Sequence, residues 1–167
     1  MTGIELRPLS PKDGPLVYRL LQRIPAHENG FYNGANGLSY EEYKKWLLRR
    51  DEIRRGINLE EGTVAESIFW LIVNDIPVGI GKVRHKLTPA LKKHGGSISY
   101  SIMPQYRNNG YGTLLLSLLL EQAKSMEVPE LLAMIYNYNY PSEKVIIKNG
   151  GIFCGKTELR SYYQWNT

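Results

Sequence analysis

The sequence predicts one mixed α/β domain that spans residues 1–167. Three observations predict this fold. Short apolar stretches have the pattern of strands, others repeat apolar residues at helical spacing, and a glycine turn leads from a strand into a leucine-rich helix. A chain of this length buries a sizeable core, and no repeat, linker or low-complexity segment divides it. The expected order of elements is β-α-α-β-β-β-α-β-α-β-β.

The N-terminal half is expected to form a strand, two helices and a hairpin. Ser10 is the expected cap of the first helix, and Ser39 with Glu42 has the pattern of a capping box at the second. The segment 25–38 is rich in Gly and Asn, which predicts a loop. The expected elements are a strand at 4–7, a helix at 11–24, a helix after Ser39, and strands at 67–73 and 78–85 joined by a turn at 74–77.

The C-terminal half is expected to alternate strands and helices before a closing hairpin. Residues 114–120 place leucines almost all around their helix, which predicts that this helix is heavily buried. Residues 86–96 are expected to form a long basic connection. The expected elements are a strand at 97–103, a helix at 110–127, a strand at 130–136, a short helix at 140–149, and a hairpin of 152–155 with 158–165.

The charge of the chain is positive and unevenly distributed. The formal net charge is +5, and the basic residues concentrate in segments 44–55 and 82–93. Acidic residues interrupt the first segment, and the chain has no basic tail. The pattern therefore favours a solvated helix face and attraction of an anionic cofactor. Nucleic-acid binding is the weaker alternative.

The cysteine count and the lengths of the apolar segments exclude several classes of protein. The single cysteine, Cys154, excludes an internal disulfide framework and a cysteine zinc cluster. No group of residues has the spacing of a metal site, so we expect no metal. The apolar run Leu114 to Leu120 is too short to span a bilayer, and the N-terminus lacks the apolar region of a signal peptide. We expect a cytoplasmic protein without a membrane segment, and leave open whether it forms a homodimer.

The most informative segment is Arg107-Asn108-Asn109-Gly110-Tyr111-Gly112, between an expected strand and an expected helix. The first N–H groups of a helix lack intrahelical partners, and together with the helix dipole they form an anion site. Glycine lets a phosphate approach the backbone closely, and an arginine adds a fixed charge. This pattern predicts a pyrophosphate cradle. The alternative is an ordinary turn in which the glycines serve geometry alone.

Two well-known phosphate loops do not fit this segment. The nucleotide P-loop requires a Lys after its second Gly, and the dinucleotide fingerprint requires a third Gly. The remaining pattern, R-x-x-G-x-G after a strand, resembles the coenzyme A loop of the GNAT superfamily of N-acetyltransferases. Pro104 before the loop and the run Asn139-Tyr140-Pro141-Ser142 also resemble this family. Small predicted bacterial acetyltransferases are similar in further segments, namely Arg84-His85-Lys86-Leu87, Gly95 to Ile102 and Asn149-Gly150-Gly151.

The resemblance is strong over residues 66–165 and implies a fold and a cofactor. The implied fold is a mixed, mainly antiparallel sheet with flanking helices, in which the strands 97–103 and 131–136 splay apart. Acetyl-CoA is the implied co-substrate, without a metal, and its arm would lie between these strands. The implied contacts are the backbone of Ile102 and Met103, the side chain of Arg107, the N–H groups of Asn108, Asn109, Gly110, Tyr111, Gly112 and Thr113, and Asn139. For Asn139, a helix cap is the alternative role.

The implied activity is acetyl transfer from acetyl-CoA to a primary amine by direct attack. Many family members place a tyrosine general acid where this chain has Ile146, so Ser142 becomes the candidate acid, with Tyr138 and Tyr140 as further options. For Ser142, a hydrogen bond at the start of the helix is the alternative role. His85 is the candidate base, and Glu66 and Glu28 are others. The acceptor, a small-molecule or peptide amine, would bind near segment 25–38. The alternative function is an acyl-CoA-binding module without turnover.

Overall fold

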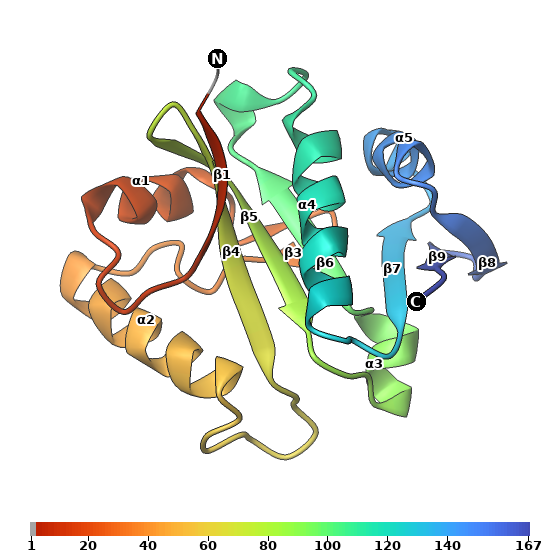
Figure 1. Ribbon diagram of the computed structural model, residues 1–167, viewed down its shortest axis with the longest axis horizontal. Coiled ribbons are helices and arrows are strands. Elements are labelled where there is room, and N and C mark those ends of the chain that lie inside the picture. The colour runs from red at the N-terminus through yellow and green to blue at the C-terminus, as the bar shows by residue number, and fades with distance from the viewer. Residues whose placement is uncertain (1–2) are drawn as a thin grey trace.

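The computed structural model describes residues 3–167 and contains helices on both sides of a sheet that divides in two (Figure 1). The helices are α1 (Pro15–Arg23), α2 (Tyr40–Arg54), α3 (Pro89–His94), α4 (Tyr111–Ser125) and α5 (Tyr140–Lys148), with a 3-10 turn η1 at Pro104–Tyr106. The strands are β1 (Ile4–Pro8), β2 (His27–Glu28), β3 (Phe31–Tyr32), β4 (Glu66–Val73), β5 (Ile76–Arg84), β6 (Ile98–Ile102), β7 (Leu131–Tyr136), β8 (Ile152–Lys156) and β9 (Arg160–Trp165).

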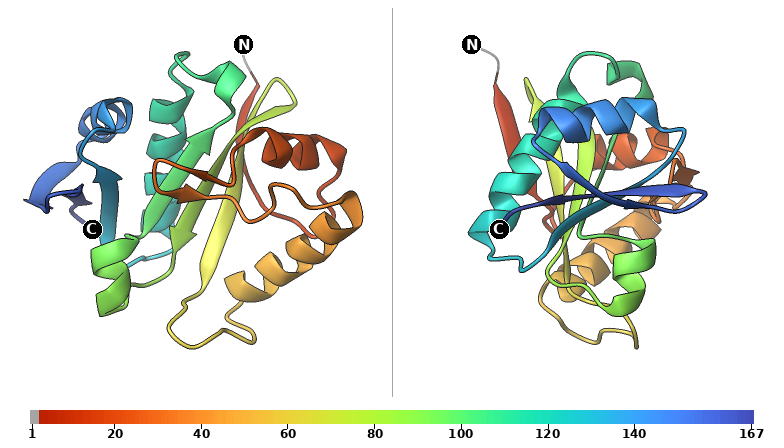
Figure 2. Two further views of the ribbon diagram at one scale, coloured as in Figure 1. Left: turned by 180° about the vertical axis from the view of Figure 1, so that it is seen from behind. Right: turned by 90° about the vertical axis from the view of Figure 1, so that its right-hand side faces the viewer.

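Two antiparallel sheets carry the fold. One has the strand order β1-β4-β5-β6, and the other has the order β7-β9-β8. The short strands β2 and β3 form a separate hairpin. Helix α4 packs on one face of the first sheet, whereas α1 and α2 pack on the other (Figures 1 and 2). The expectation of a mixed α/β fold with mainly antiparallel strands is confirmed.

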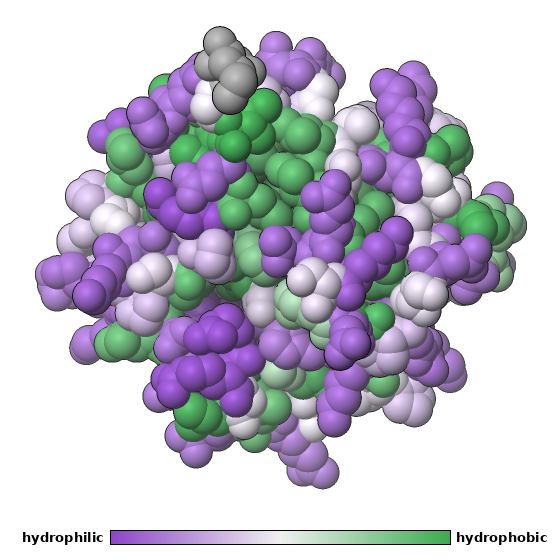
Figure 3. All heavy atoms as spheres, viewed as in Figure 1, coloured by the Kyte–Doolittle hydropathy of each residue, from purple (hydrophilic) through white to green (hydrophobic). Residues whose placement is uncertain are grey.

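Each face of the first sheet has its own apolar core, because successive side chains of a strand point to opposite faces. From β4, Phe69, Leu71 and Val73 pack with the leucines of α4. The alternate residues Ile68 and Trp70 pack with α1 and α2. All of β4 is buried, so this strand forms the centre of the molecule. On the face of the molecule that Figure 3 shows, hydrophilic and hydrophobic side chains are interspersed.

The two sheets meet at a single junction. The N–H of Ser97 donates to the carbonyl of Leu132 over 2.8 Å, and the N–H of Leu132 donates to Oγ of Ser97, also over 2.8 Å. Beyond this point β6 and β7 belong to different sheets and diverge (Figure 2). Gly96 permits the junction, because a Cβ there would lie 2.7 Å from the Leu132 carbonyl oxygen.

Local sequence signals predicted several element boundaries and missed others. Ser39 and Glu42 form the expected capping box at α2. The segment expected as a loop at 25–38 contains the β2–β3 hairpin, and the basic connection 86–96 contains α3. Ser10 is not the cap of α1, which begins at Pro15 after Gly14. Ser10 instead forms a tight turn in which its N–H donates to the Asp13 carboxylate over 2.8 Å.

The junction predicts a specific sensitivity at Gly96. Gly96→Ala should lower the free energy of unfolding by about 2–5 kcal/mol, since the left-handed backbone costs about 1–2 kcal/mol and the overlap about 1–3 kcal/mol. Gly37 has φ of +88°, but a Cβ at this position would meet no atom within 4 Å. Gly37→Ala should therefore lower the free energy of unfolding only by the backbone contribution of about 1–2 kcal/mol. Urea unfolding of both variants measures the difference, and equal losses would contradict the role of Gly96.

Candidate functional site

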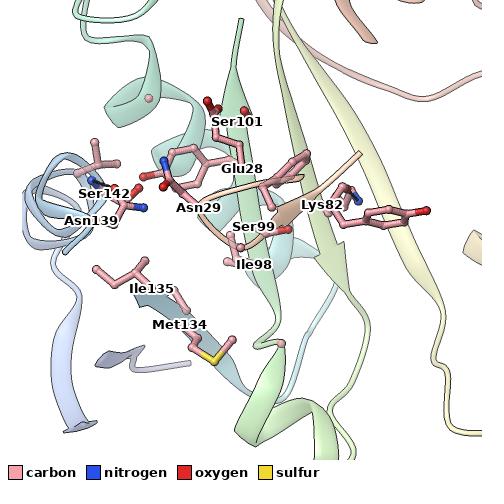
Figure 4. A pocket seen from close by; sticks show the side chains of 18 of the residues that line it. Glu28, Asn29, Lys82, Ile98, Ser99, Ser101, Met134, Ile135, Asn139 and Ser142 are labelled. Carbon is pink, nitrogen blue, oxygen red and sulfur yellow. Dashed lines mark hydrogen bonds between the residues drawn. The ribbon is translucent and has the colours of Figure 1, made fainter. Parts of the chain in front are cut away.

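A cavity of about 1160 Å³ lies where β6 and β7 diverge. Figure 4 shows Asn139, the N-cap of α5, and Ser142 of α5 on one side, Lys82 of β5 on the other, and Ile98, Ser99 and Ser101 of β6 between them. The start of α4, the β2–β3 hairpin and the C-terminal half of α2 complete the wall. The cavity therefore passes from one face of the first sheet to the other.

The strand β6 presents a free backbone edge to this cavity. In an antiparallel pair, alternate residues exchange hydrogen bonds with the partner strand. The bonds from Arg84 N–H to the Ser97 carbonyl and from Met103 N–H to the Val78 carbonyl set that alternation. Given the register of β6 with β5, the backbone groups of Ile98, Tyr100 and Ile102 point away from β5 and toward β7.

The start of α4 has free backbone donors of the kind that an anion site requires. Gly110 has φ of +81°, a left-handed conformation that favours glycine, and supplies no side-chain cap. The first helical bond runs from Leu114 N–H to the Gly110 carbonyl, over 3.1 Å. The N–H groups of Tyr111, Gly112 and Thr113 have no acceptor among residues 3–167. These three residues line the cavity, so the donors and the helix dipole are available to a phosphate.

Arg107 lines the cavity but is already engaged. Its Nε donates to the Ile102 carbonyl over 2.9 Å, and its Nη1 donates to Oε2 of Glu28 over 3.3 Å. Its Nη2 forms an ion pair with the other Glu28 oxygen. Arg107 therefore connects the loop before α4 to the β2–β3 hairpin. The charge that the sequence assigned to a phosphate is neutralised by Glu28 in this structure.

Asn139, Ser142 and Tyr100 gather at the start of α5. The Asn139 side-chain oxygen accepts from Ser142 N–H over 3.4 Å, so Asn139 caps α5 while lining the cavity. The Tyr100 hydroxyl is buried and has no hydrogen-bond partner within residues 3–167. Burial raises the pKa of Tyr100, and the neighbouring Ser142 hydroxyl offsets part of that rise. Ile146 is fully buried in the core behind them.

Four of the expected site residues do not line the cavity, namely Tyr138, His85, Met103 and Asn109. His85 is hydrogen-bonded through Nε2 to Oγ of Ser67 over 2.8 Å, and burial, followed by the charge of Arg54, lowers its pKa. Met103 is buried in the core with α1 and α2, and both its backbone groups are bonded, to Val78 and Tyr106. The Asn109 side chain turns back to donate to the Tyr106 and Arg107 carbonyls.

A cluster of charged side chains lines the end of the cavity near α2, and the sequence predicted its members but not their ion pairs. Glu66 is buried and forms ion pairs with Arg50 and with Arg84, whose Nε lies 3.3 Å from Oε2. Lys82 donates to the Tyr32 carbonyl, and its Nζ lies 4.7 Å from the centre of the Phe31 ring. Burial lowers the pKa of Lys82 to about 8, with Glu66 opposing and the two arginines adding to that decrease.

Comparison with known proteins decides the family. The acetyltransferase (GNAT) domain model matches residues 4–152. The chain belongs to the GNAT acetyltransferase family.

Solved GNAT structures have the same fold. Ribosomal-protein-S5-alanine acetyltransferase from Vibrio fischeri superposes with a TM-score of 0.71 at 15% identity, over 97% of this chain and 92% of that chain. RimL, a ribosomal L7/L12 alpha-N-protein acetyltransferase in complex with coenzyme A, has a TM-score of 0.70 at 16% identity, over 97% and 93%. N-acetyltransferase PseH of Campylobacter jejuni, in complex with acetyl coenzyme A, has 0.62 at 12%, over 98% of each chain. No curated protein matched the sequence.

Two further findings concern residues 3–167 only. This part of the chain contains no group of three or more His, Cys, Asp or Glu residues that could hold a metal ion. It also contains no helix of the length and apolar character needed to cross a membrane.

The lowered pKa of Lys82 predicts a pH-dependent contribution to stability. Below about pH 8 Lys82 is protonated in both states, whereas between about 8 and 10.5 the unfolded chain holds the proton more tightly. Stability rises with pH where the unfolded state binds more protons. The free energy of unfolding of the parent minus that of Lys82→Met should therefore increase from pH 8 to pH 10.5. Urea titrations across this range measure it, and a constant difference would contradict the shift.

Proposed function

We propose that this GNAT protein transfers an acetyl group from acetyl-CoA to a primary amine by direct attack in a ternary complex. The observation that carries the proposal is the cavity between β6 and β7, which joins a phosphate site at α4 to a polar space on the opposite face of the first sheet. Donor and acceptor can thus enter from opposite faces and meet between the strands. The family and the neighbours with bound coenzyme A or acetyl-CoA support this assignment.

The residues of the cavity fit acetyl-CoA as a substrate. The N–H groups of Tyr111, Gly112 and Thr113 would take the pyrophosphate, together with the nearby backbone of Asn108 and Gly110. The free edge of β6 at Tyr100 and Ile102 would bond the pantetheine amides as an added strand does. The Asn139 amide nitrogen, which donates to no residue in the described chain, would bond the arm from the α5 side.

The chemistry requires a neutral amine, a polarised carbonyl and a protonated leaving thiol. A backbone N–H of β6, at Tyr100 or Ile102, would stabilise the oxyanion as the amine attacks. Ser142 would then relay a proton: its hydroxyl protonates the leaving thiolate and takes up the proton that the attacking nitrogen loses, so that no alkoxide remains. Its place in the first turn of α5 suits this role, because the helix dipole favours negative charge at that end.

We propose no dedicated base in the chain. His85 does not line the cavity, and the carboxylates of Glu28 and Glu66 are both held in ion pairs with arginines. Good alignment of thioester and amine is worth about 7 kcal/mol or more by itself. The acceptor would lose its proton to solvent before attack.

The acceptor is proposed to be an amine of a peptide or a small molecule. Two of the neighbours are named as acetyltransferases of ribosomal proteins, which supports a protein or peptide amine. A cytoplasmic location is also part of the proposal, and the free, exposed thiol of Cys154 suits a reducing compartment.

The second candidate is a GNAT module that binds acyl-CoA without turnover. The buried Ile146 favours it, because this position in many family members holds a tyrosine acid. Release of free CoA from acetyl-CoA with a panel of amines separates the two functions. Acetyl-CoA binding without thiol release across peptides and small amines would favour the module.

The start of α4 predicts a ranking of two variants. A Cβ at Gly112 would lie 3.6 Å from Val145 and 3.7 Å from Tyr100, so the extra methyls of Gly112→Val would fill the space before the helix N–H groups. We expect acetyl-CoA affinity to fall at least tenfold, since a charge-assisted hydrogen bond is worth about 1.5–3 kcal/mol. Arg107→Ala should weaken binding less, because Glu28 already neutralises that charge. Calorimetric titration, with circular dichroism as the folding control, checks the ranking.

The role of Ser142 predicts a separation of turnover from binding. Ser142→Ala should lower kcat by about 10²-fold, the lower end of the range for general acids, with little change in acetyl-CoA affinity. Ser142→Thr keeps a hydroxyl and serves as the control that should retain more activity. Steady-state CoA release and calorimetry measure the two quantities. Unchanged kcat in Ser142→Ala would remove Ser142 from the mechanism.

A further inference from the structure

We propose that the acceptor amine carries an anionic group beside it, and that Arg50, Lys82 and Arg84 bind this group. This inference rests on the proposed function, because it assigns the end of the cavity near α2 to the acceptor. The three side chains line one wall of that end. Ile80, Lys82 and Arg84 are every second residue of β5, so they share one face of the sheet. Ile80 packs on this face with α1 and α2. Lys82 and Arg84 therefore lie on the face of the sheet opposite α4, and Figure 4 shows Lys82 well apart from the α5 side of the cavity.

The register of the sheet places Lys82 close to where the reaction would occur. Lys82 lies opposite Ser99, between the two residues Ile98 and Tyr100 whose backbone faces the cavity. Paired residues on neighbouring strands lie about 5 Å apart. Lys82 and Ser99 are a pair in the register and point to the same face, away from α4. A group bonded next to the attacking nitrogen is therefore within reach of the Lys82 side chain.

The charges at this end do not balance. Glu66 is the one buried carboxylate here in the described chain, and two arginines share it. Lys82 forms no ion pair within residues 3–167; its Nζ donates to the Tyr32 carbonyl and lies over the aromatic rings of Phe31 and Tyr32. Glu60, the other carboxylate on this wall, is exposed to solvent. Partly buried positive charge without a counter-ion is costly, and a bound anion would remove that cost.

Donors remain for an anion to use. Nε of Arg50 is buried and has no partner in the part of the chain that the structure describes. Arg84 uses Nη1 for the Gly96 carbonyl over 2.8 Å and Nε for Glu66, so its Nη2 is outside these bonds. Arginine and lysine together suit a carboxylate or a phosphate. The lowered pKa of Lys82 agrees with a cation whose charge is not compensated.

Coenzyme A conjugates test the inference without knowledge of the natural acceptor. Three conjugates join the CoA sulfur, through an acetyl bridge, to the amino nitrogen of aspartyl amide, asparaginyl amide or phosphoseryl amide. The first two differ only in one charge. Calorimetric titration of the full chain should give at least tenfold tighter binding for the aspartyl than for the asparaginyl conjugate. The phosphoseryl conjugate distinguishes phosphate from carboxylate as the preferred anion.

Two charge-removing variants locate the effect. Lys82→Met should reduce the preference for the aspartyl conjugate to less than threefold. Lys144→Met is the matched control, because Lys144 also lines the cavity but lies on α5, and it should leave the preference unchanged. A preference that survives Lys82→Met, or is lost equally in Lys144→Met, would overturn the assignment to this wall.

The failure of the inference is distinguishable from the failure of the proposed function. Equal binding of the aspartyl and asparaginyl conjugates to the parent protein, with CoA itself bound, would overturn the anionic acceptor and leave acetyl transfer intact. A parent protein that binds neither CoA nor any conjugate would overturn both. The comparison in the parent protein needs no variant, so it stands even if Lys82→Met does not fold.

Discussion

The site depends on one constraint, namely that β6 and β7 are joined at Ser97 and Leu132 and nowhere beyond. If the two strands continued to pair, the backbone groups of Tyr100 and Ile102 would bond to β7 and the cavity would close. Backbone groups are rarely left without a partner away from water. An edge left free inside the molecule is therefore a place for a ligand or for water. The split sheet creates the binding edge and the passage through the molecule together.

Where β6 and β7 end, their backbone carbonyls accept hydrogen bonds from the following turns and not from the other strand. The Ile102 carbonyl accepts from Nε of Arg107, and the Tyr136 carbonyl accepts from Asn139 N–H. Each turn leads directly into a helix, α4 after β6 and α5 after β7. Both helices therefore begin at the cavity, and their N-terminal dipoles point into it. The hairpin of Glu28 is fixed to the same turn through Arg107, so one arginine connects the proposed donor side to the proposed acceptor side.

Short-range patterns predicted most of the fold and the glycine turn that leads into α4. The Ser39–Glu42 box, the strand alternation and the glycines at 110 and 112 act within a few residues, so they can be read from one segment. Long-range partners could not be read in this way. Glu28 neutralises Arg107 from 79 positions away, and Glu66 is held by Arg50 and Arg84 from two other elements. The sequence assigned Arg107 to a phosphate and Met103 to the pantetheine arm. In the structure Arg107 is bonded to Glu28, and the backbone of Met103 is bonded to Val78 and Tyr106.

The charge distribution of the cavity connects the donor site to the proposed acceptor. Helix N-termini make the donor end positive, and Arg50, Lys82 and Arg84 make the other end positive. Between them Ile98, Ala133 and Ile135 form an apolar middle, where electrostatic effects are stronger than in water. A protonated amine is disfavoured in such a place, whereas its neutral form is not. Burial of the acceptor amine in this apolar middle would therefore lower the pKa of its ammonium group and help direct attack to proceed without a dedicated base.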